Sequence, residues 1–282
     1  MNVWEEGVMD KIEKFENALI HHGSFSNRLY IMKFPKGGNT GLLKKISQFA
    51  IENGYTKIVG KIPKGKLNMF LQNDFKMEAS VPKFYKGRST CCFVSKFIDP
   101  ERAIFNPEPL NLFNQVLDDY IITNKPVLSN GFVFRLLMPD DAPVMIDVFK
   151  QVFKTYPFPV HNKEYIEHTM ENDVCYFGAF QNGELCSISS SEMDIANKNA
   201  EMTDFAVLNS ARGRGLSKIL LTFMEEQMKL KGIKTLYTIA RLNSIPMNKT
   251  FLGAGYSYAG TLINNTNISG GIESMNVLYK FV

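Results

Sequence analysis

The sequence contains few of the residues that mark several common protein classes. Its four cysteines, two of them the adjacent pair Cys91-Cys92, have neither zinc-ligand spacing nor the pattern of a disulfide framework. We therefore expect small buried thiols in a reducing compartment and no metal site. No apolar run reaches the roughly 18 residues that a membrane-spanning helix needs, so no membrane association is expected. The first residues carry acids and lack an apolar segment, which is not typical of a signal peptide and predicts a cytoplasmic protein.

The sequence also lacks a large excess of charge of one sign. The formal net charge is only +4, and neither a basic helix nor an interleaved row of aromatic side chains stands out. This pattern does not favour a nucleic-acid partner. The length of 282 residues, with 45% hydrophobic residues, indicates one large or two ordinary domains with packed cores.

From residue 126 onward, strand-like and helix-like segments follow one another in a clear order. Strands are predicted at 132–137, 174–180, 184–194, 200–208, 234–241, 256–264 and 274–282, with helices at 142–156, 162–170, 216–231 and 244–253. Gln-Asn-Gly at 181–183 predicts a hairpin turn. The order β-α-α-β-β-β-α-β-α-β-β predicts a mixed, mostly antiparallel α+β sheet flanked by helices.

The first hundred residues repeat part of this pattern. Strands are predicted at 28–34, 56–63 and 89–97, with helical segments at 42–55 and 66–75. Residues 99–125, which include a helix-like segment at 110–122, form a connection. YTKIVGKIP is similar to IKTLYTIAR, and FVSKF is similar to VLYKF. We therefore predict a smaller, degenerate half-domain with a connecting segment at 1–125 and the larger domain at 126–282. Since a half-sheet exposes an edge, we expect the half-domain either to pack against the larger domain or to form a homodimer.

The segment SARGRGLSKILL, residues 210–221, places glycines and arginines where an amphipathic helix begins. Backbone N–H groups are unpaired at a helix N-terminus, and glycine lets a ligand approach them closely, so this is a candidate phosphate site. A Walker A loop is excluded because the order is Gly-Leu-Ser-Lys. A dinucleotide-binding fingerprint is excluded because lysine occupies the position of the third glycine. An ordinary basic helix start is the alternative.

The element order and the loop together resemble the acetyl-CoA-dependent GNAT N-acetyltransferases over residues 131–282. The loop matches the family signature Gln/Arg-x-x-Gly-x-Gly/Ala except at its last position, which is serine here. The resemblance implies that acetyl-CoA is the donor and that the pantetheine arm pairs with a fourth strand that splays from the fifth. The implied donor-binding residues are Phe205, Ala206, Val207, Arg212, Gly213, Arg214, Gly215, Leu216, Ser217, Lys218, Asn243 and Asn248. For the two asparagines, a helix-capping role is an open alternative.

Acetyl transfer to an amine also needs a group that removes the proton of the nucleophile. The family often places a carboxylate for this purpose on the fourth strand, which corresponds to Glu201; an exposed strand glutamate is the alternative. The tyrosine that the family uses as general acid is replaced by Phe251. The acid therefore stays open among Tyr256, our first candidate, Tyr258, a water molecule and direct departure of the thiolate.

Acidic residues gather on the two predicted strands at 184–194 and 200–208, which favours a cationic amine as acceptor. Segments such as YPFPV, AEMTDFAV and NNTNISGGIESMN resemble the β-lysine N6-acetyltransferase family, which makes the osmolyte N6-acetyl-β-lysine. The resemblance implies an acidic partner for the β-ammonium group, with Asp204 and Glu192 as candidates. It also implies a donor for the carboxylate, with Arg241 and Tyr156 as candidates. A polyamine or peptide-amine acetyltransferase and a non-catalytic CoA-binding module are the alternatives.

Overall fold

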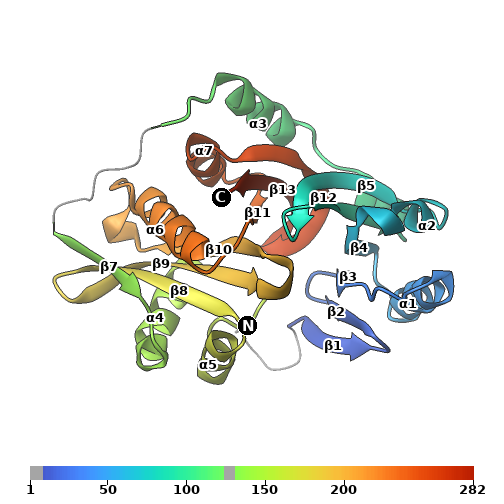
Figure 1. Ribbon diagram of the computed structural model, residues 1–282, viewed down its shortest axis with the longest axis horizontal. Coiled ribbons are helices and arrows are strands. Elements are labelled where there is room, and N and C mark those ends of the chain that lie inside the picture. Colours follow the sequence, from blue (N-terminus) through green and yellow to red (C-terminus); the bar gives the residue numbers. More distant parts are fainter. Residues whose placement is uncertain (1–8, 124–130) are drawn as a thin grey trace.

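The computed structural model describes residues 9–123 and 131–282, whose strands form one thirteen-stranded sheet (Figure 1). The strands are β1 (Lys11–Phe15), β2 (Ala18–Gly23), β3 (Arg28–Lys33), β4 (Lys57–Pro63), β5 (Lys76–Tyr85), β6 (Ser89–Phe97), β7 (Phe132–Leu136), β8 (Val174–Gln181), β9 (Glu184–Asp194), β10 (Asn199–Val207), β11 (Thr235–Arg241), β12 (Ser257–Ile268) and β13 (Gly271–Phe281). The helices are α1 (Thr40–Glu52), α2 (Leu67–Leu71), α3 (Glu108–Asp119), α4 (Ala142–Val152), α5 (Lys163–Glu171), α6 (Leu216–Leu230) and α7 (Ile245–Gly253).

The strand order is symmetric about one junction. It runs β1-β2-β3-β4-β6-β5-β12-β13-β11-β10-β9-β8-β7, so β3-β4-β6-β5 on one side corresponds to β10-β11-β13-β12 on the other. The pairs β3/β4 and β10/β11 are parallel, and the other described ladders are antiparallel. The predicted mixed, mostly antiparallel sheet is therefore confirmed, and the similar segments of the sequence occupy equivalent strands.

Helices cover both faces of the larger half of the sheet. Helix α6 packs on β8, β9 and β10 from one face, while α4 and α5 pack on the opposite face (Figure 1). Alternation along β8 produces this arrangement, because Tyr176 belongs to the core under α4 and Phe177 to the core under α6. In the smaller half, α1 and α2 cover one face of the sheet.

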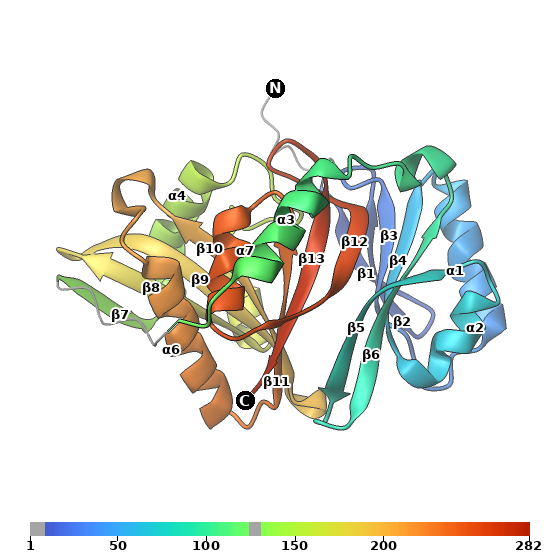
Figure 2. The ribbon, with the colours of Figure 1, turned by 90° about the horizontal axis from the view of Figure 1, so that it is seen from above.

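The two halves meet where β5 and β12 lie side by side (Figure 2). Their ladder consists of one described pair, Ala79 with Gly260. A core containing Phe84 and Phe93 from the first half and Leu262 and Val277 from the second crosses this junction. The half-domain therefore packs against the rest of the chain, which is one of the two roles expected for it.

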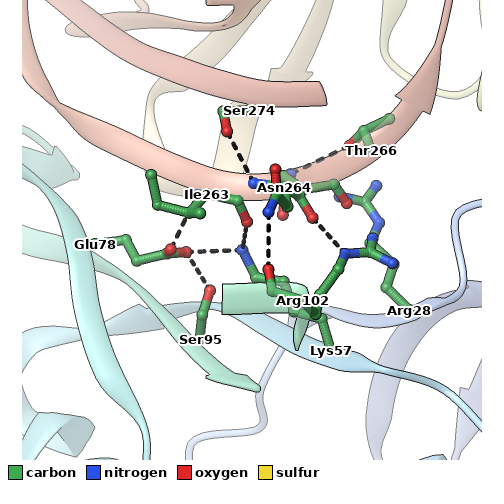
Figure 3. A network of polar contacts seen from close by, with 10 residues as sticks. Arg28, Lys57, Glu78, Ser95, Arg102, Ile263, Asn264, Thr266 and Ser274 are labelled. Atoms are coloured by element: carbon green, nitrogen blue, oxygen red, sulfur yellow. Dashed lines mark hydrogen bonds and ion pairs between the residues drawn. The ribbon is translucent and has the colours of Figure 1, made fainter. Parts of the chain in front are cut away.

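Polar contacts reinforce the junction around a bulge in β12. Figure 3 shows Arg28, Lys57 and Arg102 pointing toward residues 263–265, whose carbonyl oxygens they bind. Lys57 Nζ donates to the Ile263 carbonyl at 2.6 Å, and Arg102 Nε donates to the Asn264 carbonyl at 2.7 Å. Lys57 also forms a buried ion pair with Glu78 at 3.0 Å. Each cation therefore satisfies a carbonyl that the bulge removes from the ladder.

Three strands of the smaller half were not predicted. Strand β5 contains Pro82, a residue typical of chain breaks, and it accommodates this residue at a bulge where Lys83 has a φ of 54°. Strands β1 and β2 carry charged and histidine side chains in place of an apolar run. The helix predicted at 142–156 ends at Val152, so residues 153–158 form a loop.

The predicted boundary at 125/126 lies in the segment 124–130, outside the described residues, and the division into two domains stays a prediction. All four cysteines are free thiols. Within residues 9–123 and 131–282, no helix has the length and apolar character required to span a membrane.

Candidate active site

A cavity of about 830 Å³ lies at the level where β10 and β11 part. Its volume is within the range of small-molecule sites. The larger half contributes the loop 152–158, strands β9 to β12, and the starts of α6 and α7, while the smaller half contributes β3 and β4. Both halves of the sheet therefore form walls of one cavity.

The expected splay between the fourth and fifth strands of the larger half is present. The parallel ladder of β10 and β11 runs from Asn199–Thr235 to Glu201–Tyr237 and ends there. The ladder of β9 and β10 shifts register between Thr203 and Ala206, where Asp204 has a φ of 53°. Phe205 and Val207 line the cavity beyond this bulge, whereas Ala206 is buried opposite Ile188. Beyond Glu201, β10 therefore has no described ladder with β11, and its cavity side faces the space between the two strands.

Helix α6 begins at this cavity without a side-chain cap. Its N-cap residue is Gly215, with a φ of 72°, and Gly213 has a φ of 78°. A side chain at either position would be strained, although the space around each Cβ position is open. The equivalent helix α1 is capped, because Asn39 Oδ1 accepts a hydrogen bond from Leu42 N at 3.1 Å. The first N–H groups of α6, unlike that of Leu42 in α1, therefore have no side-chain cap, which leaves room for a ligand to accept from them.

Most of the predicted donor-binding loop borders the cavity. The lining includes Arg212, Gly213, Gly215, Leu216, Ser217 and Lys218. Arg214 instead donates to Gln181 Oε1 at 3.1 Å and lies over the Phe132 ring. Asn243 borders a separate small pocket beside α3.

Asn248 is fully buried and does not line the cavity. Its side chain donates to the carbonyls of Arg241 and Ser244, both at 2.9 Å, and accepts from Asn276 Nδ2 at 2.9 Å. These contacts support the alternative in which this asparagine holds the backbone at the start of α7.

Three predicted acidic residues come together at the cavity. Glu201 lies directly opposite Glu192 across the β9/β10 ladder, and Asp204 follows at the bulge. Burial and the negative charges of Glu201 and Asp204 raise the pKa of Glu192 to about 8. Burial also raises the pKa of Glu201, while the Lys61 ammonium and the Tyr237 hydroxyl act in the opposite direction. A carboxylate with a raised pKa beside a ligand cavity is suited to accept a proton near neutral pH.

Asp204 is held by two side chains. Tyr156 donates its hydroxyl proton to Asp204 Oδ1, and Ser190 Oγ donates to Oδ2 at 2.6 Å. Arg241 forms a two-point ion pair with Glu273, at 3.0 and 2.6 Å. Tyr156 and Arg241 line the cavity, but each is already engaged with a carboxylate of the protein.

Tyr256, the first candidate for the general acid, does not lie at the cavity as that role would require. Its side chain is fully buried against Phe251, and it does not border the cavity. Burial raises its pKa well above the ordinary value, and Glu225 adds to this effect. The Tyr258 hydroxyl is bonded to Thr261 Oγ1 at 2.6 Å and is also outside the cavity. The structure thus brings neither tyrosine to the groups predicted to react.

The wall from the smaller half was not predicted from the sequence. Alternation along β3 and β4 turns Arg28, Tyr30 and Met32, with Val59 and Lys61, to the face opposite α1. Lys61 Nζ donates to Tyr237 Oη at 2.9 Å, which links this wall to Glu201. Arg28 in RLYIMK and Lys61 in KIVGKIP alternate with the apolar residues that face α1, and this placement is the signal that could have revealed the face.

We expect the Lys61→Met variant to need a higher pH for the same activity. Burial raises the pKa of Glu201 and Lys61 lowers it, so removing the lysine raises it further. A base works when deprotonated, so the acid limb of the kcat/KM profile should move to higher pH. Profiles from pH 6 to 10 measure this, with exposed Lys64→Met as the control. Coincident profiles for the two variants would exclude electrostatic control of Glu201 by Lys61.

Comparison with known proteins gives consistent matches. The model of the acetyltransferase (GNAT) family matches residues 145–254. The chain is 38% identical to the β-lysine N6-acetyltransferase of Methanococcus maripaludis, over 96% of this chain and 99% of that protein. It is 36% identical to the β-lysine N6-acetyltransferase of Methanosarcina mazei, over 54% of this chain and 56% of that protein. It is 29% identical to the N-acetyltransferase YodP of Bacillus subtilis, over 93% of this chain and 95% of that protein.

Proposed function

Because the chain belongs to the β-lysine N6-acetyltransferase family of GNAT enzymes, we propose that it acetylates the terminal N6 amine of β-lysine. It is an N-acetyltransferase, and acetyl-CoA is its donor. The observation that carries the choice of acceptor is the group of carboxylates, Asp204 buried and Glu192 and Glu201 half-buried, at the point where β10 and β11 part. A cationic amine is the ligand that such a group attracts.

We propose that the uncapped start of α6 binds the pyrophosphate of the donor. The backbone N–H groups from Gly213 to Ser217 would converge on it, whereas that of Lys218 already donates to the Gly215 carbonyl at 3.1 Å. The partial positive charge of the helix N-terminus favours an anion there. The pantetheine arm would pair with backbone groups of β10 at residues 205–207, beyond the point where the ladder to β11 ends. This arrangement directs the thioester toward Glu201.

The proposed reaction is direct transfer. Glu201 accepts a proton from the N6 ammonium group, directly or through water, and the neutral amine attacks the thioester carbonyl. The tetrahedral intermediate collapses, the C–S bond breaks, and CoA leaves as the thiolate. The attacking nitrogen, positively charged after its attack, releases its second proton to water and becomes the neutral amide nitrogen. Because Tyr256 lies outside the cavity, the thiolate takes its proton from water or leaves unprotonated. Asp204 and Glu192 are the proposed partners of the β-ammonium group.

A competition assay tests the acceptor. The full chain is given acetyl-CoA with β-lysine, α-lysine, ornithine, cadaverine and spermidine at equal concentrations, and the acetylated products are separated by mass spectrometry. We expect N6-acetyl-β-lysine to dominate and cadaverine to be a poor acceptor, because it lacks the carboxylate. A dominant product from spermidine or cadaverine would replace β-lysine by a polyamine as the acceptor. Binding of acetyl-CoA without any product would favour the CoA-binding module.

We propose that the enzyme is cytoplasmic. The edge of the half-sheet at β5 is paired with β12, so a homodimer is not required to cover it. The homodimer remains an alternative that sedimentation would test.

A further inference from the structure

We propose that Arg28, on β3 of the smaller half, binds the carboxylate of the acceptor and makes the enzyme selective for amino acids over simple amines. This inference rests on the proposed function and names the residue that would decide its acceptor specificity. Arg28 is only 4% exposed, and it lines the same cavity as Glu201 and Asp204. The proposed base and the proposed carboxylate partner therefore belong to different halves of the sheet.

The hydrogen bonds of Arg28 leave part of its guanidinium free. Nη1 donates to the Asn265 carbonyl at 3.0 Å, which fixes the side chain on the β12 bulge. Nε is buried and has no partner among the described residues. Within residues 9–123 and 131–282, no carboxylate lies within ion-pair distance of this guanidinium. A buried cation with an unused donor is costly unless a ligand supplies the missing acceptor.

The half-buried cations near the cavity are already engaged. Arg241 is paired with Glu273, and Lys61 donates to Tyr237. Arg102 donates to three oxygens, those of Asn264, Thr56 and Ser26, and does not line the cavity. Arg28 is therefore the buried cation of the cavity wall that has an unused N–H donor for an anionic group of the ligand.

The ligand chemistry follows from the charges on the two walls. The carboxylates on the β10 side of the cavity favour an ammonium group of the ligand. The Arg28 guanidinium on the β3 side favours a carboxylate of the ligand. A β-amino acid with a terminal amine carries both groups at one end and the reacting nitrogen at the other. Recognition of the carboxylate by Arg28 would place that end against the smaller half and leave the N6 amine near Glu201.

The test compares acceptors that differ only in the carboxylate. Pentane-1,4-diamine is β-lysine with its CH₂–COO⁻ group replaced by a methyl group. In Arg28→Met, we expect kcat/KM for β-lysine to fall on the order of 10²–10³-fold, because a buried charged hydrogen bond to the substrate is lost. We expect kcat/KM for the diamine to change less than about threefold. Arg28→Lys should keep part of the preference, since lysine retains the charge but not the planar fork.

Arg102→Met is the matched control, because it removes a half-buried guanidinium from the same junction without removing a residue of the cavity wall. It should lower activity on both acceptors in parallel, if at all. A parallel loss in Arg28→Met, or an unchanged preference for β-lysine, would overturn the carboxylate role. If the wild-type enzyme prefers α-lysine, the β-lysine assignment fails, and α-lysine with cadaverine then tests Arg28 in the same way. A wild-type preference for diamines would overturn both.

Discussion

Replacing Glu201 by glutamine should lower kcat about 10²–10⁴-fold while leaving the affinity for acetyl-CoA nearly unchanged. Glutamine keeps the shape of the side chain but cannot accept the proton of the amine. Glu201 is the carboxylate at the last pair of the β10/β11 ladder, where the strands part. Its raised pKa makes it a stronger base than an exposed glutamate.

Steady-state rates with β-lysine measure the loss, and calorimetry with acetyl-CoA measures donor binding. Glu184→Gln is the control, because it makes the same change at an exposed position of β9. A decrease of less than about threefold between pH 7 and 9 would remove Glu201 from the proton transfer and direct attention to Asp204.

Gly260→Ala should reduce the free energy of unfolding by about 3 kcal/mol or more and abolish most activity. Gly260 has a φ of 142°, and an added Cβ would lie 2.1 Å from the Glu78 carbonyl oxygen and 2.8 Å from Ala79 Cα. These are backbone atoms of β5, so they cannot move aside without separating the two strands. Since each half supplies one wall of the cavity, separation at this junction should also remove the site.

Urea unfolding followed by circular dichroism measures the change in stability. Gly183→Ala is the control, because Gly183 also has a positive φ, 85°, but its Cβ position is open. We expect this variant to lose about 1–2 kcal/mol from backbone strain alone. Equal losses in the two variants would show that the close approach of β5 and β12 does not contribute.

The larger half could be predicted in detail because its signals are local. The turn at Asn182-Gly183, the helix stop at Gly232 and the glycines before α6 each determine a nearby boundary. The splay of β10 and the position of Glu201 followed from family resemblance. Asn248 was ambiguous because an asparagine near a helix start can bind either a ligand or the backbone, and here its bonds go to the backbone.

The smaller half was less predictable because its role depends on distant contacts. Strand β5 has a proline and is stabilised by pairing with β6 and by the junction with β12. Arg28 and Lys61 were not singled out from the sequence, because only the packing of the second half over them creates a cavity wall. Tyr156 was predicted at the end of a helix, whereas the loop after Val152 brings it to Asp204.

The contrast between the capped α1 and the uncapped α6 has a consequence for how new activities could arise in this scaffold. The Asn39 side chain caps the start of α1, which is the position equivalent to the proposed donor site at α6. The first copy of the repeat is therefore not required to bind acetyl-CoA. With the donor bound as proposed, we expect that side chains on β3 and β4 can be exchanged without altering the backbone at the start of α6. On this proposal, the larger half carries the residues for acetyl transfer, and β3 and β4 of the smaller half carry the side chains that select the acceptor. A library that varies Arg28, Tyr30 and Val59 would search for acceptors of different charge with the donor chemistry held constant.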